Sequence, residues 1–330
     1  MRVTLAVPNL LAMDRAALAA VPGLARFARH AESIAAEPAG MSTALLVAAG
    51  APRETPVAPL AALGAGFAPG DALVQHADPV ALVAGRDDVL LSGRVDDLSP
   101  ADADAILAAL NLHFADDGLA FHAPRPDAWF VTSRSTELPD TTPLPAVRGA
   151  IQSHLPRGEH RKTWRRFLSE MQMLVHEHPA NAPREAQGRA PVTGIWLWGG
   201  GTLRDVPATP RIAMFAAPGP AGDVVRGLAV HARSSAPAPP ADFASLPRGD
   251  DAIVVLPAPA NAGDVAALAS AWLAPAAMAL ERRALAQLTL VADGNGAALV
   301  WTARAPSWRQ RLRARFAPRA FAFPAPDGTP

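Results

Sequence analysis

The sequence predicts an α/β fold: a largely parallel sheet with helices on both faces, and a small inserted α+β module. Short apolar runs at 2–7, 195–198, 252–256 and 288–292 are typical of buried strands. Helical patterns separate the runs of the second half, which favours parallel strands covered on both faces. A β-β-α-β-β alternation over 73–134 has the size of a separate module.

We therefore expect a core domain built from 1–72 and 151–330, with the module inserted as 73–150. The remaining elements follow from periodicity and from turn residues. In the core we expect helices at 14–30, 41–49, 57–64, 163–178, 224–231 and 264–281, and further strands at 211–215 and 298–303. In the module we expect strands at 72–76, 89–93, 119–122 and 129–132, and a helix that Ser99 caps and Pro100 opens.

Composition narrows the function classes. Among 330 residues, 30 acidic and 30 basic side chains cancel, so no basic face for nucleic acid is expected. The chain has no cysteine, which removes disulfides, thiolate nucleophiles and cysteine-bound metals. No uninterrupted apolar run is long enough to span a membrane, and the N-terminus lacks the features of a signal peptide. We expect a cytoplasmic protein.

The chain is organised around residues 163–201. Pro179 ends the helix that opens this stretch, so His178 and Asn181 fall at the helix end and in the next turn. The helix has one apolar stripe, formed by Trp164, Phe167, Leu168, Met171, Leu174 and Val175. A buried strand with two tryptophans follows, and then Gly199-Gly200-Gly201, which can turn sharply and align N–H groups into an anion-binding nest.

These residues give two readings of the central stretch. In one reading, they keep a pocket for a small anionic ligand, with an arginine as a bidentate grip. That candidate site consists of His178, Asn181, Arg184, Trp198, Gly199, Gly200 and Gly201. In the other reading, Asn181 caps the helix end, Arg184 is a surface residue, and the glycines make a tight turn under two indoles.

The segment HPANAPREAQGRAPVTGIWLWGGG, at 178–201, carries a resemblance to known families. The chain most resembles the RpfE-type regulatory proteins, which have a similar WRRFLSEMQMLVHEHPAN block and a late segment like SWRQR. More distantly it resembles the archaeal-type cofactor-independent phosphoglycerate mutases of the alkaline-phosphatase superfamily. That resemblance implies the fold expected above, with the inserted module in place.

The mutase resemblance also implies two divalent metals and a serine or threonine nucleophile, which this chain does not match well. The first strand ends in Val7-Pro8-Asn9, and only Ser42 and Thr43 lie near the nucleophile position. Of the expected Asp and His ligands only Asp264 and Asp293 remain. We therefore expect no dinuclear metal site and no cofactor, because neutral groups would not replace the missing ligands.

Three hypotheses follow. The first is a non-catalytic, phosphoglycerate-mutase-like regulatory or ligand-sensing protein, a pseudoenzyme that binds a small anionic ligand. The second is an active metal-dependent phosphoglycerate mutase or phosphatase with a rebuilt site. The third is a protein-interaction module whose contact surfaces are the Pro-rich loop 234–249 and the basic tail 308–319.

Overall fold

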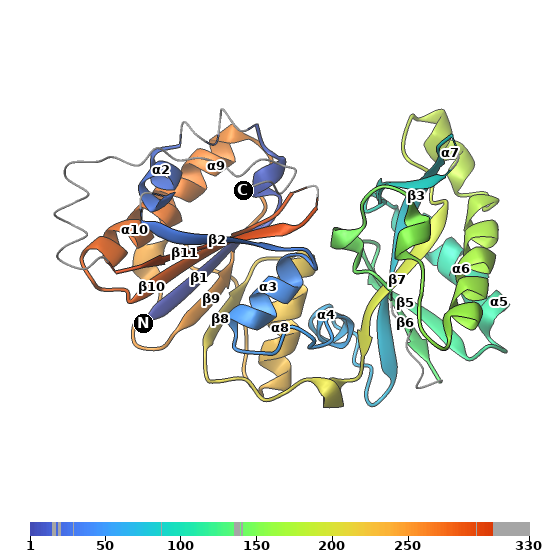
Figure 1. The fold of residues 1–330 in the computed structure, drawn as a ribbon, viewed down its shortest axis with the longest axis horizontal. Coiled ribbons are helices and arrows are strands. Elements are labelled where there is room, and N and C mark those ends of the chain that lie inside the picture. Colours follow the sequence, from blue (N-terminus) through green and yellow to red (C-terminus); the bar gives the residue numbers. More distant parts are fainter. Residues whose placement is uncertain are drawn as a thin grey trace. The chain divides into compact units, whose positions relative to one another are not determined.

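The computed structural model describes residues 1–14, 18, 21–28, 30–86, 88–134, 139, 141–294 and 296–305 (Figure 1). The predicted basic tail 308–319 lies outside these residues. The chain forms two compact units. Unit 1 contains Met1–Arg53, Ala208–Val225 and the described chain from Ala232 onward, and unit 2 contains Glu54–Pro207 and Arg226–His231.

Unit 1 is built on a six-stranded sheet of order β2-β11-β10-β1-β9-β8. Its three parallel pairs are β1–β10, β1–β9 and β8–β9, and β11 runs antiparallel to both β10 and β2. The strands are β1 (Arg2–Val7), β2 (Ala31–Glu37), β8 (Ala213–Ala216), β9 (Ala252–Val255), β10 (Gln287–Ala292) and β11 (Ala298–Arg304). The prediction of an α/β fold with a mostly parallel sheet is confirmed.

Helices cover both faces of this sheet (Figure 1). On one face lie α2 (Pro22–Ala28), α9 (Ala262–Leu268) and α10 (Ala274–Glu281), with a π-helical turn over Ala269–Leu273 between the last two. On the other face α3 (Met41–Ala48) contacts β1, β2, β10 and β11. The helix α8 (Pro220–His231) belongs to unit 1 up to Val225.

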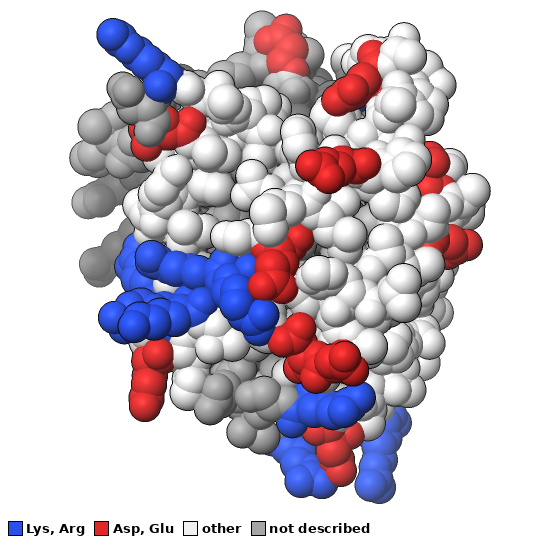
Figure 2. Space-filling view, turned by 90° about the vertical axis from the view of Figure 1, so that its right-hand side faces the viewer, with Lys and Arg blue, Asp and Glu red and all other residues white. Residues whose placement is uncertain are grey.

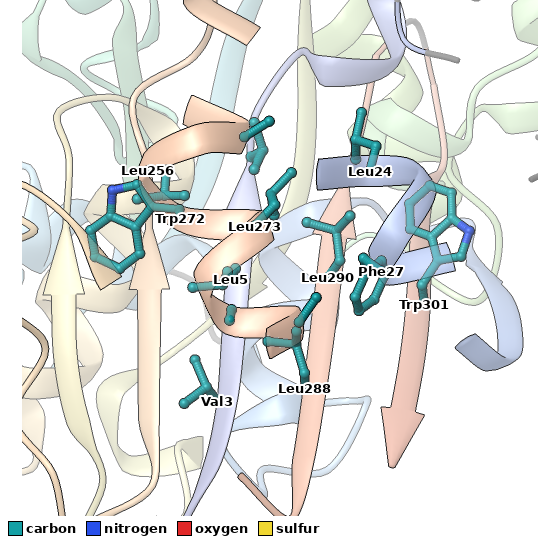
Figure 3. Packing of buried hydrophobic residues seen from close by; sticks show 14 of the residues in the cluster. Val3, Leu5, Leu24, Phe27, Leu256, Trp272, Leu273, Leu288, Leu290 and Trp301 are labelled. Atoms are coloured by element: carbon teal, nitrogen blue, oxygen red, sulfur yellow. The ribbon is translucent and has the colours of Figure 1, made fainter. Parts of the chain in front are cut away.

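The main core of unit 1 fills the space between the sheet and the first group of helices. Figure 3 shows Leu5 and Leu290 pointing from neighbouring strands toward Leu273, with Phe27 and Trp301 at one side. All five side chains are at most 3% exposed. Alternate strand residues supply this face, as the two-residue repeat of a strand requires.

The helical segment Ala262–Glu281 is long and apolar enough to cross a membrane by length and composition alone. In the structure its apolar side packs onto the sheet, because Val265, Trp272, Leu273 and Leu280 belong to the core of unit 1. A helix that covers a sheet meets the same test, so this segment is weak support for a membrane span.

The edge strand β2 was not predicted. Its sequence, AESIAAE, has no alternation of apolar and polar residues, and its first six residues are half-buried or exposed. Pairing with β11, from Ala31 to Glu37, sets its conformation. Sheet pairing therefore decided the structure of this segment over local propensity.

Unit 2 has a second sheet, in which β7 (Gly194–Gly201) is antiparallel to β3 (Leu73–Ala84). From the sequence we expected β7, which contains Trp196 and Trp198, to belong to the parallel sheet, and that prediction was wrong. The strands are β3 (Leu73–Ala84), β4 (Val89–Arg94), β5 (Leu119–Arg125), β6 (Ala128–Ser133) and β7 (Gly194–Gly201). All the pairings in this sheet are antiparallel.

Helices α5 (Pro100–Phe114) and α6 (Arg161–His176) pack on one face of the second sheet. The predicted apolar stripe of α6 contributes Trp164, Phe167, Leu168, Met171 and Val175 to that core. Unit 2 also contains α4 (Ala58–Gly64) and α7 (Asn181–Ala186). The second compact unit therefore includes more of the chain than the predicted module 73–150, because α4, α6 and β7 pack against the module's sheet.

Short 3₁₀ turns complete the two units. They are Leu10–Ala12, Leu144–Ala146, Ile151–His154, Leu203–Asp205 and Phe243–Ser245. The last turn lies in the Pro-rich loop 234–249. There Asp242 caps the turn and Leu246 is buried in the core of unit 1, so part of this loop is packed against the fold.

Candidate functional site

The carboxyl edge of the parallel strands is the first place to look for a site in unit 1, because open α/β sheets bind ligands there. The strands β8, β9, β1 and β10 all end at this edge. β2 also ends there, since it is antiparallel to β11, which is antiparallel to β10. The residues at or just after these ends include Asn9, Glu37 and Asp293.

Asp293 follows β10 and binds the loop after β1. Its Oδ1 accepts the backbone N–H of Asn9 at 2.7 Å, and its backbone carbonyl accepts the N–H of Leu11 at 2.7 Å. Asn9 has a left-handed backbone, with φ of 58°. Burial raises the pKa of the Asp293 carboxyl, while the hydrogen bond from Asn9 acts in the opposite direction. This carboxylate therefore fixes a loop.

Glu37 ends β2 and is 7% exposed. Its Oε1 accepts the N–H of Ala39 at 3.0 Å and pairs with Arg53 at 2.7 Å. After β9, the exposed Asp264 accepts the N–H of Ala260 at 2.9 Å and so closes the start of α9. Each of these carboxylates has a partner from its own neighbourhood.

The predicted nucleophile region is the start of α3. Thr43 is buried at 4% exposure, and Ser42 is half-buried one residue before it. Across the described ranges, no three His, Cys, Asp or Glu side chains are grouped so that they could hold a metal ion. The donor set at this edge does not fit the two metals that the mutase resemblance implies, because the carboxylates named above bind their own chain and no histidine joins them.

Asn181, one of the predicted ligand residues, is 5% exposed and begins α7. Its Nδ2 donates to the carbonyls of Val175 at 2.8 Å and Val192 at 2.9 Å. Its Oδ1 accepts the N–H of Val192 at 2.8 Å. Asn181 thus caps the end of α6 and attaches it to the chain entering β7. His178 lies beside it, with Nδ1 accepting the N–H of Ala180 at 3.2 Å.

Arg184 was expected either at the surface or on a ligand, and the structure shows a third arrangement. It is 2% exposed, its Nε donates to the carbonyl of Ala190 at 2.9 Å, and its Nη2 pairs with Asp97. The guanidinium lowers the pKa of the Asp97 carboxyl through this hydrogen bond. Arg189 pairs with the same carboxylate at 2.9 Å. Arg184 therefore joins the loop after α7 to the segment before α5.

Trp198 and the glycines lie at the other end of β7. The indole Nε1 donates to Asp78 Oδ2 at 2.6 Å, and the ring stacks on His76 with centroids 4.5 Å apart. Arg94 Nε pairs with the other oxygen of Asp78 at 3.0 Å. The indole N–H of Trp198 is therefore already paired with Asp78 inside the sheet.

Gly199, Gly200 and Gly201 continue the strand and do not form a loop. Val74 pairs with Gly201 and His76 with Trp198, so β7 carries one extra residue there, as in a β-bulge. Gly199 has φ of 67°, which suits glycine. A Cβ on Gly201 would lie 2.5 Å from Pro56 Cβ, so the backbone is closely packed.

The structure does not bring the predicted ligand residues into one pocket. Asn181 contacts Val192, just before β7, whereas the glycines end this strand. At about 3.3 Å per residue, the two groups are on the order of 20 Å apart along the strand. The reading in which Asn181 caps a helix agrees with the observed contacts.

A pocket of about 290 Å³ in unit 2 was not predicted from the sequence. Its apolar wall comes from β3, β4, β7 and the Ile151–His154 turn, and α6 supplies polar residues. The lining residues are Val80, Leu82, Val89, Ile151, Gln152, Leu155, Arg165, Leu168, Ser169, Gln172, Gly194, Ile195 and Trp196. The signal available in the sequence was the polar series Arg165, Ser169 and Gln172, which shares one side of α6.

Surface charge agrees with the balanced composition. On the face shown in Figure 2, Lys and Arg side chains gather in groups, acidic side chains lie beside some of them, and a broad area carries no charge. This face is not the continuous basic surface that a nucleic-acid backbone requires.

Comparisons with known proteins connect the chain to one enzyme class. No protein-family model matches it. Over 139 residues the chain is 29% identical to 2,3-bisphosphoglycerate-independent phosphoglycerate mutase 2 of Methanothermobacter thermautotrophicus. This match covers 41% of this chain and 35% of that protein. Over 88 residues it is 33% identical to a probable 2,3-bisphosphoglycerate-independent phosphoglycerate mutase of Geobacter sulfurreducens, covering 24% and 21%.

Two solved structures align along most of the chain. The cofactor-independent phosphoglycerate mutase of Thermoplasma acidophilum aligns with a TM-score of 0.40 and 17% identity, covering 92% of this chain and 90% of that one. The PH0037 protein of Pyrococcus horikoshii aligns with a TM-score of 0.43 and 14% identity. That alignment covers 92% of this chain and 87% of that one. The sequence matches span about a third and about a fifth of the two curated relatives. The chain is a distant homologue of the cofactor-independent phosphoglycerate mutases.

Proposed function

We propose that this chain is a non-catalytic relative of the cofactor-independent phosphoglycerate mutases that serves as a regulatory or ligand-sensing protein of the RpfE type in the cytoplasm. One observation carries the proposal. At the carboxyl edge of the parallel sheet, Asp293 holds Asn9 and Glu37 holds Arg53 and Ala39, so these carboxylates serve the fold.

Phosphoryl transfer needs concentrated positive charge opposite the transferring group, and paired metal ions supply it in two-metal enzymes. Such ions need several acidic or imidazole ligands that converge on one point. Asp264 closes the start of its own helix instead, and the described part of the chain offers no such convergent group. A scaffold with these contacts supports binding or partner recognition better than turnover.

Activity measurements with the full chain test the proposal. The purified protein is incubated with 2-phosphoglycerate or 3-phosphoglycerate, with and without Mn²⁺, and bound metal is measured by elemental analysis. We expect no interconversion above the protein-free rate and no stoichiometric metal. Turnover that disappears on chelation would overturn the proposal.

The variant Asp293→Asn separates a structural role from a ligand role. We expect it to lower the melting temperature without changing the background rate, because Asp293 binds the loop after β1. The matched control is Asp264→Asn, which alters an exposed helix start and should have a smaller effect on melting. Loss of a metal-dependent rate in Asp293→Asn would instead identify a rebuilt active site.

A further inference from the structure

The pocket of unit 2 combines an apolar wall with the cationic side chain of Arg165. Val80 and Leu82 of β3 and Trp196 of β7 form one side, and Ile151 and Leu155 close it from the turn before α6. The volume, about 290 Å³, is at the lower end for small-molecule sites. Among the described residues that line it, none is acidic.

Of the lining residues that the structure describes, only Arg165 is charged. Its Nε donates to the carbonyl of Pro156 at 2.9 Å, which fixes the base of the guanidinium. Its neighbour Arg166 differs, because it pairs with Asp117 at 2.9 Å and with Glu170 at 3.0 Å. Across the described residues, Arg165 pairs with no carboxylate, and the hydrogen bond through Nε leaves its two Nη groups for a ligand.

Neutral donors lie on the same side of α6. Ser169 is four residues after Arg165, and Gln172 is three residues later, so both face the pocket from one helix surface. Gln152 joins them from the turn. One cation with neutral donors suits a singly charged planar anion. A guanidinium can bind a carboxylate through two parallel hydrogen bonds.

We infer that this pocket binds a small carboxylic acid with an apolar body, whose carboxylate lies against Arg165 and whose body lies on Leu82 and Trp196. The inference rests on the proposed function in one respect, which is that the bound acid acts as a regulatory ligand. Binding of the acid itself is measured separately from turnover. A doubly charged phosphate is a poorer match, because a single arginine would balance only half its charge.

Binding of simple probes tests the inference. Benzoate and hexanoate are titrated into the full chain by calorimetry and by ligand-observed NMR, with benzamide, hexanamide and inorganic phosphate as comparisons. We expect saturable binding of one molecule per chain for at least one acid, and binding at least about tenfold weaker for its amide. Equal binding of acid and amide, tighter binding of phosphate, or no saturable binding of any acid would overturn it.

Matched variants locate the site. Arg165→Gln should weaken acid binding by about tenfold to a hundredfold, since charge-assisted hydrogen bonds are lost. The control Arg161→Gln removes the same charge from the same helix at a residue whose Nη1 donates to the carbonyl of Gly158 at 3.1 Å and that is not among the described residues lining the pocket. Equal weakening in both variants would show general attraction and would contradict the inference.

A third variant separates pocket occupancy from misfolding. Ser169 is exposed on α6, so Ser169→Trp should leave the fold intact and fill the pocket mouth. We expect an unchanged melting temperature with loss of acid binding. Full binding in Ser169→Trp would place the acid elsewhere and overturn the inference. If the mutase assay showed turnover while these probes bound as expected, only the non-catalytic proposal would fail.

Discussion

Replacing Asn181 by alanine should destabilise unit 2 more than any nearby surface change. The side chain makes three short hydrogen bonds in a site that is 5% exposed, to the carbonyls of Val175 and Val192 and from the N–H of Val192. Each bond contributes about 0.5–1.5 kcal/mol net, and buried partners left unpaired add to the loss. We expect Asn181→Ala to lower the free energy of unfolding by about 3 kcal/mol.

Asn111 provides a matched control. Its amide makes the same kind of paired contact with one residue, donating to the Phe121 carbonyl at 3.0 Å and accepting the Phe121 N–H at 2.7 Å. It is half-buried, so water can replace part of the loss after Asn111→Ala. We expect a cost of about 1 kcal/mol there.

Urea unfolding and amide hydrogen exchange measure the difference. Exchange at Val192 reports locally, which matters because a chain with two units need not unfold in one step. The Val192 amide should exchange much faster in Asn181→Ala and remain protected in Asn111→Ala. Equal costs in the two variants, or an unchanged Val192 exchange rate, would refute the claim that Asn181 holds the end of α6 to β7.

Two further predictions concern unit 1. Hydrogen bonds from Arg26, at 2.9 and 2.6 Å, and then from His30 lower the pKa of Glu281 to about 2. A carboxyl with a lowered folded-state pKa stabilises the fold above its unfolded pKa and loses this effect as the pH falls toward 2. Thermal melts of Glu281→Gln should therefore depend less on pH between about 4.5 and 2 than those of the parent, and equal slopes would contradict this. A Cβ on Gly294 would lie 2.7 Å from Ala12 N, so Gly294→Ala should cost about 1–3 kcal/mol in urea unfolding. A Cβ on Gly93 would meet no described atom within 4 Å beyond its chain neighbours, so Gly93→Ala should change the stability little.

Much of the fold could be predicted because local sequence patterns identify its core helices and strands. The apolar stripe of α6 and the cap of α5 by Ser99 both follow from spacing and residue type, and both are present. The predicted strands at 288–292 and 298–303 are also present, as β10 and β11, and they pair as an antiparallel hairpin. In these cases the burial pattern and the local propensity agree.

The errors arise where pairing partners are distant in sequence. β2 has no strand pattern of its own. It pairs with β11, in which Ala298, the partner of Glu37, lies more than 260 residues further along the chain. β7 was assigned to the parallel sheet because helices flank it, yet its partner is β3. Apolar runs identify a buried strand without saying which sheet it joins.

The candidate site was less predictable than the fold. Arginine is rarely buried, so Arg184 could not be recognised as an internal residue without its partner Asp97, which lies 87 positions earlier. The predicted ligand residues are close in sequence, but an extended strand separates them in space. The pocket at Arg165 requires three separate segments to meet, which no local pattern shows.

The position of β1 has a consequence for how the chain matures on the ribosome. β1 lies in the middle of its sheet, between β9 and β10, although it is synthesised before the other strands of that sheet. Its hydrogen-bonding partners emerge more than 240 residues later, as the pairing of Val3 with Ala252 shows. At ordinary synthesis rates this is a delay on the order of tens of seconds. Until then β1 lacks its two neighbouring strands, whereas the stretch Glu54–Pro207, which makes up most of unit 2, has already been synthesised in full.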